Sequence, residues 1–300
     1  MVRSPRLARL LAASLGIGLT AALALAQAPS PTPRPSRKPA PKTAAAAPRP
    51  VPTPEARAID ILKASCAKLA AAGSMSFTAL GAYEVPSLWG PPLIYGRIYE
   101  VALQRPDKLA VMTVGDGPRT EFYDDGKVMM SFHPAENLVA VADAPPSIDA
   151  ALEKLYGNSG TYFPFTDVIV SDPWKDIASD LTGAFYVGES MLVGGKTTDV
   201  IAYESNGVFI QMWIGRDDKL PYMARAMYHD DPLQLRQSVQ FSKWNLSPAV
   251  APETFTTAKA SGADKIPFNH PKMKSDLPSA VQPVGAPKKA PKPAATAKPQ

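Results

Sequence analysis

The sequence predicts a mainly β (α+β) fold: one long curved antiparallel sheet that forms a half-barrel, covered by an N-terminal helix and a short helical insertion. Three observations predict it. Apolar residues recur with a period of two over most of residues 75–244, turn residues separate these runs, and two stretches have helical periodicity instead. A sheet of about ten or eleven strands must curl, and the helices would then cover its inner face.

A helix is expected at about residues 55–72. Thr53 is its expected N-cap and Gly73 its C-terminal signal. Its apolar positions follow helical spacing: Ile59, Leu62, Cys66 and Leu69. Because Cys66 is the chain's single cysteine, the folded part has no internal disulfide, and we interpret Cys66 as a buried small hydrophobic residue.

Six strands are expected in the first half of the sheet. A Pro-rich loop at 86–92 separates the first two, since no strand could contain that run of prolines. Gly- and Asp-rich turns separate most of the others. The expected strands are 75–85, 93–103, 108–115, 119–124, 127–132 and 137–142.

Helical periodicity returns between 147 and 181, followed by five more strands. Asn206-Gly207 predicts a tight hairpin, because both residues tolerate the positive φ angles of a type I′ turn. The expected helices are 147–156, 164–170 and 173–181, and the expected strands are 184–193, 197–203, 208–214, 221–229 and 235–244.

The N-terminus has the layout of a secretory signal peptide over residues 1–26. Three arginines precede an uncharged run from Leu10 to Ala26, which ends in a small-residue Ala-x-Ala site. We expect cleavage near Ala26 and a periplasmic protein; an uncleaved anchor is the alternative. No later segment is apolar and long enough to span a membrane.

Charge divides the remaining chain into three parts. Residues 27–54 and 269–300 are Pro/Ala/Lys-rich, carry +5 each and are expected to be a disordered linker and tail. Residues 55–268, the expected single folded domain, hold 18 basic and 26 acidic residues, a formal charge of −8. An acidic domain argues against nucleic-acid binding. The basic tails serve either as solubilising spacers or as weak contacts with an anionic envelope surface.

Five short motifs, in this order and spacing, resemble a known family. They are Arg105–Leu109, Tyr123–Lys127, Tyr186–Gly188, Leu220–Tyr222 and Phe241–Asn245. The family is that of predicted periplasmic proteins grouped as domain of unknown function 2092, which is similar to lipoprotein carriers of the LolA/LolB type. The resemblance covers about 55–268 and implies a half-barrel with a helical lid; the carriers hold acyl chains in that cavity. Their cavity arginine and lipid-contacting loops cannot be aligned residue by residue with this sequence, so no functional residue is transferred.

A catalytic or metal-binding constellation is absent from the sequence. The three histidines, His133, His229 and His270, lack metal-ligand spacing, and no Gly-x-Ser-x-Gly motif occurs. The paired aspartates at 124–125 and 217–218 stand in turns, where Asp is favoured for backbone reasons. We therefore expect a protein that is not an enzyme and that uses no cofactor or metal.

Aromatic and Met residues in unusual places are the candidate ligand contacts. They either rim an apolar cavity or pack the helices on the sheet. The leading hypothesis is a periplasmic non-enzymatic carrier for a lipid, acyl chain or lipoprotein. The alternative is an interaction module without a cavity, tethered to the envelope by its basic tails. The candidate residues are Trp89, Met129, Phe163, Phe165 and Trp213.

Overall fold

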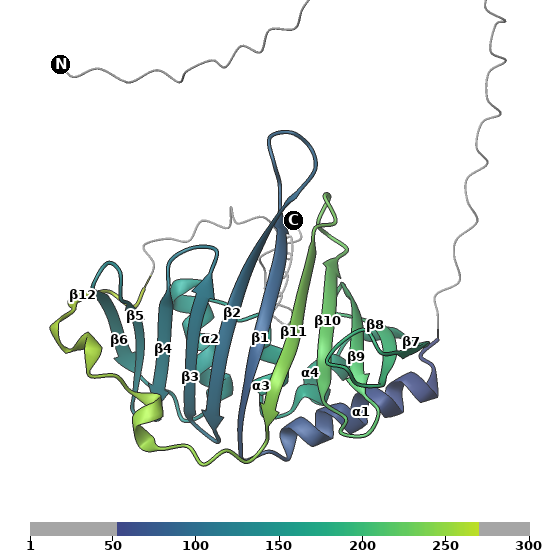
Figure 1. The fold of residues 1–300 in the computed structure, drawn as a ribbon, viewed down its shortest axis with the longest axis horizontal. Coiled ribbons are helices and arrows are strands. Elements are labelled where there is room, and N and C mark those ends of the chain that lie inside the picture. Colours follow the sequence, from purple (N-terminus) through teal and green to yellow (C-terminus); the bar gives the residue numbers. More distant parts are fainter. Residues whose placement is uncertain (1–52, 270–300) are drawn as a thin grey trace, which may run out of the picture. The chain divides into compact units, whose positions relative to one another are not determined.

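The computed structural model describes residues 53–269, which form a single twelve-stranded sheet with helices across one face (Figure 1). The expected signal peptide and most of both tails lie outside the described residues. The predicted fold class is confirmed, with one strand more than expected. The strand order is β12-β6-β5-β4-β3-β2-β1-β11-β10-β9-β8-β7, and all pairs are antiparallel except β12 with β6.

The first half of the sheet is a meander in which each strand pairs with the next. Each of these strands lies within one residue of its expected bounds, because the turns between them contain the Gly and Asp residues that end them. The strands are β1 (Ser74–Val85), β2 (Leu93–Gln104), β3 (Lys108–Gly115), β4 (Thr120–Asp125), β5 (Val128–His133) and β6 (Leu138–Asp143).

The helical insertion then carries the chain from β6, near one edge of the sheet, to β7 at the other edge. It contains α2 (Ile148–Ser159), α3 (Thr166–Ile169) and α4 (Pro173–Ala178). The Ser147 hydroxyl accepts a hydrogen bond from the Ala150 amide at 3.2 Å and caps α2. This helix ends three residues later than predicted, because Gly160, with a φ of 69°, is the residue that terminates it.

A second meander returns the chain to β1. Asn206 and Gly207 have φ angles of 53° and 73°, so the expected type I′ hairpin is confirmed. The last strand of this meander (Arg236–Asn245) pairs with β1, from Tyr83 opposite Gln237 to Ser76 opposite Asn245. This pairing joins the two meanders. The strands are β7 (Leu181–Ser190), β8 (Thr198–Ser205), β9 (Val208–Gly215), β10 (Pro221–Tyr228) and β11 (Arg236–Asn245).

Helix α1 (Ala56–Ala70) packs on α3, α4, β7 and β8. The helix lies within two residues of its expected bounds, but both predicted end signals, Thr53 and Gly73, were wrong. The N-cap is Glu55, held by β7: its amide donates to the Ala184 carbonyl and its carboxylate accepts from the Tyr186 amide, each at 2.8 Å. Gly73 does not cap the helix, because its carbonyl accepts from the Arg105 amide at 2.8 Å in the link to β1.

Cys66 lies on the buried face of α1 and is 4% exposed. Burial, together with the negative charges of Asp172 and Asp167, raises the pKa of its thiol to about 12. The interpretation of Cys66 as a buried small hydrophobic residue is confirmed.

The segment after β11 was not predicted to have structure. It contains η1 (Pro252–Phe255), η2 (Lys259–Gly262) and β12 (Asp264–Ile266), and it crosses the outer face of the sheet to pair with β6 (Figure 1). Phe255 is 1% exposed and packs on Ala110 and Tyr123. Single-turn helices and a three-residue strand are too short to produce a periodic pattern. None of the helices within 53–269 has the length and apolarity to cross a membrane.

Replacing Phe255 with Ala tests whether this segment is an integral part of the fold. We expect Phe255→Ala to lower the free energy of unfolding by about 3–5 kcal/mol, because it removes a fully buried ring and leaves a cavity. Denaturant unfolding measures the change. The matched control is Phe185→Ala on β7, whose ring is 41% exposed. Equal small losses in both variants would show that the C-terminal segment contributes little to stability.

Candidate functional site

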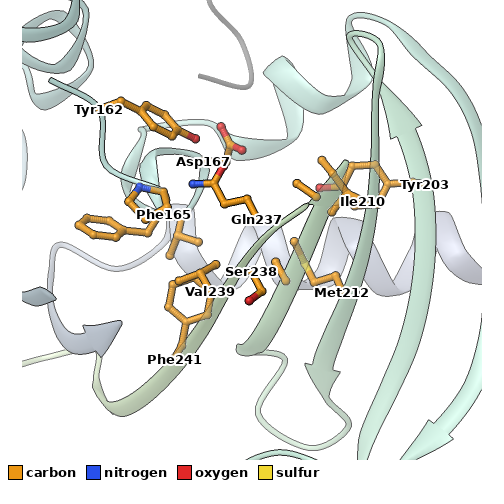
Figure 2. A pocket seen from close by; sticks show the side chains of 14 residues that line it. Tyr162, Phe165, Asp167, Tyr203, Ile210, Met212, Gln237, Ser238, Val239 and Phe241 are labelled. Atoms are coloured by element: carbon orange, nitrogen blue, oxygen red, sulfur yellow. The ribbon is translucent and has the colours of Figure 1, made fainter. Parts of the chain in front are cut away.

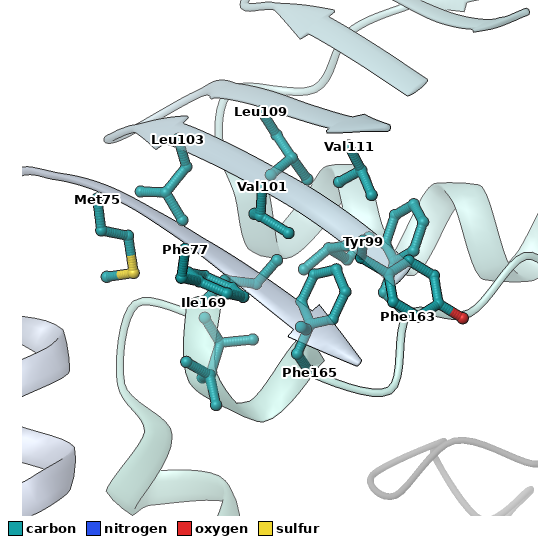
Figure 3. Packing of buried hydrophobic residues seen from close by; sticks show 14 of the residues in the cluster. Met75, Phe77, Tyr99, Val101, Leu103, Leu109, Val111, Phe163, Phe165 and Ile169 are labelled. Atoms are coloured by element: carbon teal, nitrogen blue, oxygen red, sulfur yellow. The ribbon is translucent and has the colours of Figure 1, made fainter. Parts of the chain in front are cut away.

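The inner face of the sheet meets the insertion through a cluster of aromatic rings (Figure 3). The Phe165 ring lies edge-on to Phe77 at 5.5 Å and to Tyr99 at 5.3 Å, measured between ring centroids. Phe163 stacks on Phe165 at 5.4 Å, with 9° between the ring planes. Both insertion rings come from the loop between α2 and α3, so this loop is attached to the sheet chiefly by its aromatic side chains.

A small cavity lies beside Phe165, between α3 and strands β8–β11 (Figure 2). Its volume is about 50 Å³, enough for a water-sized group, whereas ligand pockets usually measure about 300–1,000 Å³. Most of its walls are apolar. The lining residues are Tyr162, Pro164, Phe165, Asp167, Val168, Tyr203, Ile210, Met212, Ala224, Ala226, Gln237, Ser238, Val239 and Phe241.

The segment Phe163–Ile169, here called the lid, forms one wall of this partly open cavity. Within residues 53–269, the backbone and side-chain hydrogen bonds of the lid run inside the segment and to its neighbour Val170. Firm polar attachment begins just beyond it. The Arg105 guanidinium donates to the Val170 carbonyl at 2.9 Å, and the Ser171 amide donates to Asp149 at 2.9 Å. Lifting the lid would therefore break ring contacts but no hydrogen bond to the sheet.

Asp167 is the acid of this site. It lies on α3 and lines the cavity. Burial, with a smaller contribution from the charge of Asp176, raises the pKa of Asp167 from 3.8 to about 7. The side chain therefore changes charge near neutral pH beside an apolar cavity.

Three further groups respond electrostatically to Asp167. Burial raises the pKa values of Cys66, Tyr203 and Tyr228, and in each case the negative charge of Asp167 raises them further. The Tyr228 hydroxyl is buried and has no hydrogen-bond partner in the described part of the chain. The region around α3 thus holds several polar groups with little solvent and few partners.

The sequence-predicted contacts occupy three different places. Met129, Phe163 and Phe165 are buried on the inner face, and each is at most 5% exposed. Trp213 is 7% exposed, but it points to the opposite face of β9 from its neighbour Met212, which lines the cavity. Of these, Phe165 alone also lines the cavity. Trp89 lies elsewhere, 92% exposed in the loop between β1 and β2. Their role in ligand binding stays a prediction.

Sequence reasoning missed Asp167 and the polar wall residues Tyr203 and Gln237. A signal for Asp167 did exist, since it is the one acid between Phe163 and Val170 in an otherwise uncharged stretch. Tyr203 and Gln237 carried no such signal, because they reach the cavity only through the pairing of distant strands.

A second hollow lies on the outer face, between strands β1–β4 and the C-terminal segment. It is a groove of about 550 Å³ with a mixed lining. Glu100, Lys243, Glu253 and Lys259 contribute charge, whereas Ala110 and Met112 are among its apolar residues.

The geometry offers no assembled catalytic or metal-binding group within 53–269. No set of three or more His, Cys, Asp or Glu side chains is placed to hold a metal ion there. The aspartates of the turns serve the backbone: Asp125 accepts from the Lys127 and Val128 amides at 2.8 Å each. Asp218 accepts from the Leu220 amide at 3.1 Å.

Fold and site together define a β-sheet protein with a helical lid over its inner face. The chain belongs to the family described as "Predicted periplasmic protein (DUF2092)", which matches residues 58–269. The protein is therefore periplasmic, and the family expected from the sequence motifs is confirmed. No curated protein matches the chain.

Several solved structures are similar to this chain. The complex of Pseudomonas aeruginosa MucA/MucB matches with a TM-score of 0.40 and 20% identity, over 68% of this chain and 62% of that one. An outer membrane lipoprotein-sorting protein domain from Vibrio parahaemolyticus matches with a TM-score of 0.33 and 10% identity, over 66% of this chain and 96% of that one. A LolA superfamily protein from Nitrosomonas europaea matches with a TM-score of 0.29 and 11% identity, over 67% of this chain and 97% of that one.

The chain spans between 60% and 63% of the MucB chains that it matches. At these TM-scores and identities, the solved structures say nothing about what this protein binds.

Neutralising Asp167 should change how stability depends on pH. Its raised pKa means that the folded state holds the proton more tightly, so the wild-type protein loses stability as pH rises from about 4 to about 7. Asp167→Asn removes that loss. Relative to wild type, its free energy of unfolding should gain about 1–3 kcal/mol between pH 5 and pH 8.

Denaturant unfolding at both pH values measures this gain. Asp180→Asn, an exposed acid at the end of the same insertion, controls for the loss of one charge. A difference between Asp167→Asn and wild type that stays constant from pH 5 to pH 8 would contradict the raised pKa.

Proposed function

We propose that this protein is a non-enzymatic periplasmic carrier that binds a hydrocarbon chain, from a lipid or a lipoprotein, between the inner face of the sheet and the lid. The observation that carries the proposal is that the lid forms one wall of a mostly apolar cavity and rests on the sheet by side-chain packing, without hydrogen bonds to the sheet in the described residues. A cover of this kind can open at the expense of apolar contacts that a ligand's own apolar surface would replace.

The present cavity of about 50 Å³ represents the closed form. An acyl chain needs several times that volume, so the lid rings must leave their places when the ligand enters. Burial of the chain contributes about 0.8 kcal/mol per CH2, which offsets the lost ring contacts once several methylenes are covered. In this proposal Phe163 and Phe165 exchange their contacts with Tyr99 and Phe77 for contacts with the ligand.

Asp167 gives the proposed site a polar end. When protonated, its carboxyl can donate a hydrogen bond to an ester or amide oxygen of the ligand headgroup. When ionised, it would oppose the burial of an anionic headgroup at the same place. The ligand that fits best is therefore an uncharged or acylated group with one carbonyl near its apolar chain.

The proposal extends to the ends of the chain, which lie outside the described residues. Export would use the signal peptide of residues 1–26, with cleavage near Ala26. Residues 27–54 and 269–300, each with a charge of +5, would make weak contacts with anionic envelope polymers, and these contacts would weaken with added salt.

Native mass spectrometry of the exported full chain, purified gently from the periplasm, tests the carrier proposal. We expect a bound mass that extracts into organic solvent. Ala224→Val, which adds two methyl groups in the lid cavity, should reduce the occupied fraction by at least about fivefold, because filled space excludes the ligand.

The matched control is Ala102→Val, which makes the same change in the outer groove. It should leave the bound fraction unaltered. If Ala102→Val instead abolishes the bound mass, the ligand lies in the outer groove. A bare protein mass that stays unchanged after incubation with phospholipids and acylated peptides would contradict the proposal and favour the interaction module.

A further inference from the structure

The hairpin of β1 and β2 extends beyond the rest of the sheet. These strands pair with each other up to Val85 opposite Leu93. Their outer neighbours stop earlier: β11 ends its pairing at Tyr83, and β3 ends at Arg97. The loop that joins the two strands therefore stands clear of neighbouring strands, and Figure 1 shows it as the tall loop above the sheet.

The tip of this hairpin presents large apolar side chains to solvent. Leu88 and Trp89 are 102% and 92% exposed, and below them Ile94 and Leu93 are 70% and 51% exposed. Exposing neighbouring Trp and Leu side chains at the tip of a hairpin is unfavourable in water, and no other part of the folded protein covers them.

The tip is also held in shape. The Ser87 hydroxyl donates to the Pro91 carbonyl and accepts from the Trp89 amide, the latter at 3.2 Å. Pro86, Pro91 and Pro92 fix the backbone on both sides of the turn. At the base, the rings of Tyr83 and Tyr95 stack with their centroids 6.0 Å apart. The apolar tip is therefore preformed.

Charged side chains are absent from the outer part of the projection. The twelve residues from Val85 to Gly96 contain none, although charged residues make up 20% of the chain. The nearest charges stand at the base and are engaged there. The Glu84 carboxylate accepts from the Arg236 amide at 2.9 Å, Arg97 donates to the Asp116 carbonyl at 3.2 Å, and the Asp116 carboxylate accepts from the Gly96 amide at 2.7 Å.

We propose that the tip of the β1–β2 hairpin, with Leu88 and Trp89 leading, inserts into the interfacial region of a phospholipid bilayer. An uncharged segment that carries a Trp and Leu or Ile side chains suits this region, where an indole ring is accommodated at headgroup level. The acidic domain, with a charge of −8 over 55–268, is not attracted to anionic lipid, so this contact is hydrophobic in origin.

The size of the tip separates a bilayer from a protein partner. A stable protein interface needs about 800 Å² from each side, whereas one Trp contributes about 150–250 Å². The other large exposed side chains of the projection are Leu88, Leu93, Ile94 and Tyr95, of which only Leu88 is as fully exposed as Trp89. A bilayer requires no such area, since lipid surrounds an inserted apolar side chain on all sides. This inference is independent of the proposed carrier function, because neither Leu88 nor Trp89 lines the lid cavity.

Flotation of the exported full chain with phosphatidylcholine vesicles tests the inference. Salt at 1 M shortens the screening length to about 3 Å and suppresses contacts of the basic tails. The wild-type protein should float with the vesicles, and lipids brominated on the acyl chain should quench Trp89 fluorescence. The double variant Leu88→Ser/Trp89→Ser should lower the vesicle partition coefficient at least about tenfold.

The matched control is Met191→Ser/Leu192→Ser, which removes two apolar side chains that are 72% and 71% exposed in the β7–β8 turn. It should bind vesicles as wild type does, and both variants should keep the wild-type melting temperature. The inference is overturned if wild type stays unbound at 1 M salt, if both double variants lose binding equally, or if binding needs anionic lipid and low salt, which would assign it to the tails.

Discussion

The pairing of β1 with β11 is the contact on which the rest of the structure depends. Each meander alone would present half of an apolar face, and only this pairing joins the halves into one sheet. The joined face needs a cover that no single helix could provide. The insertion supplies it for β1–β6 and α1 supplies it for β7–β9, so two buried clusters form on one continuous surface.

Local chemistry explains why most elements could be predicted from the sequence. The strands end where Asp, Asn and Gly side chains satisfy or permit the turn, as at Asn206-Gly207 and Asp124-Asp125. The ends of α1 could not be predicted in this way. Their hydrogen bonds go to Ala184, Tyr186 and Arg105, which come from other elements far along the chain.

The candidate site shows the same division. Phe163 and Phe165 stood out beside Pro164, and the structure places both rings between the insertion and the sheet. The sequence marks Asp167 only as the one acid between Phe163 and Val170; its raised pKa could not be predicted, because it depends on walls contributed by β8–β11. A solvent-exposed Asp and a buried one have the same neighbours in the sequence; what distinguishes them is long-range packing.

The burial of Cys66 determines when the protein can form a disulfide-linked dimer. The periplasm favours disulfide formation, but a thiol that is 4% exposed and has a pKa of about 12 offers almost no thiolate to an oxidant. With one cysteine in the chain, the only disulfide open to two copies joins Cys66 to Cys66. A covalent dimer in a sample of this protein therefore records molecules that have unfolded, and its abundance measures the damage that the sample has undergone.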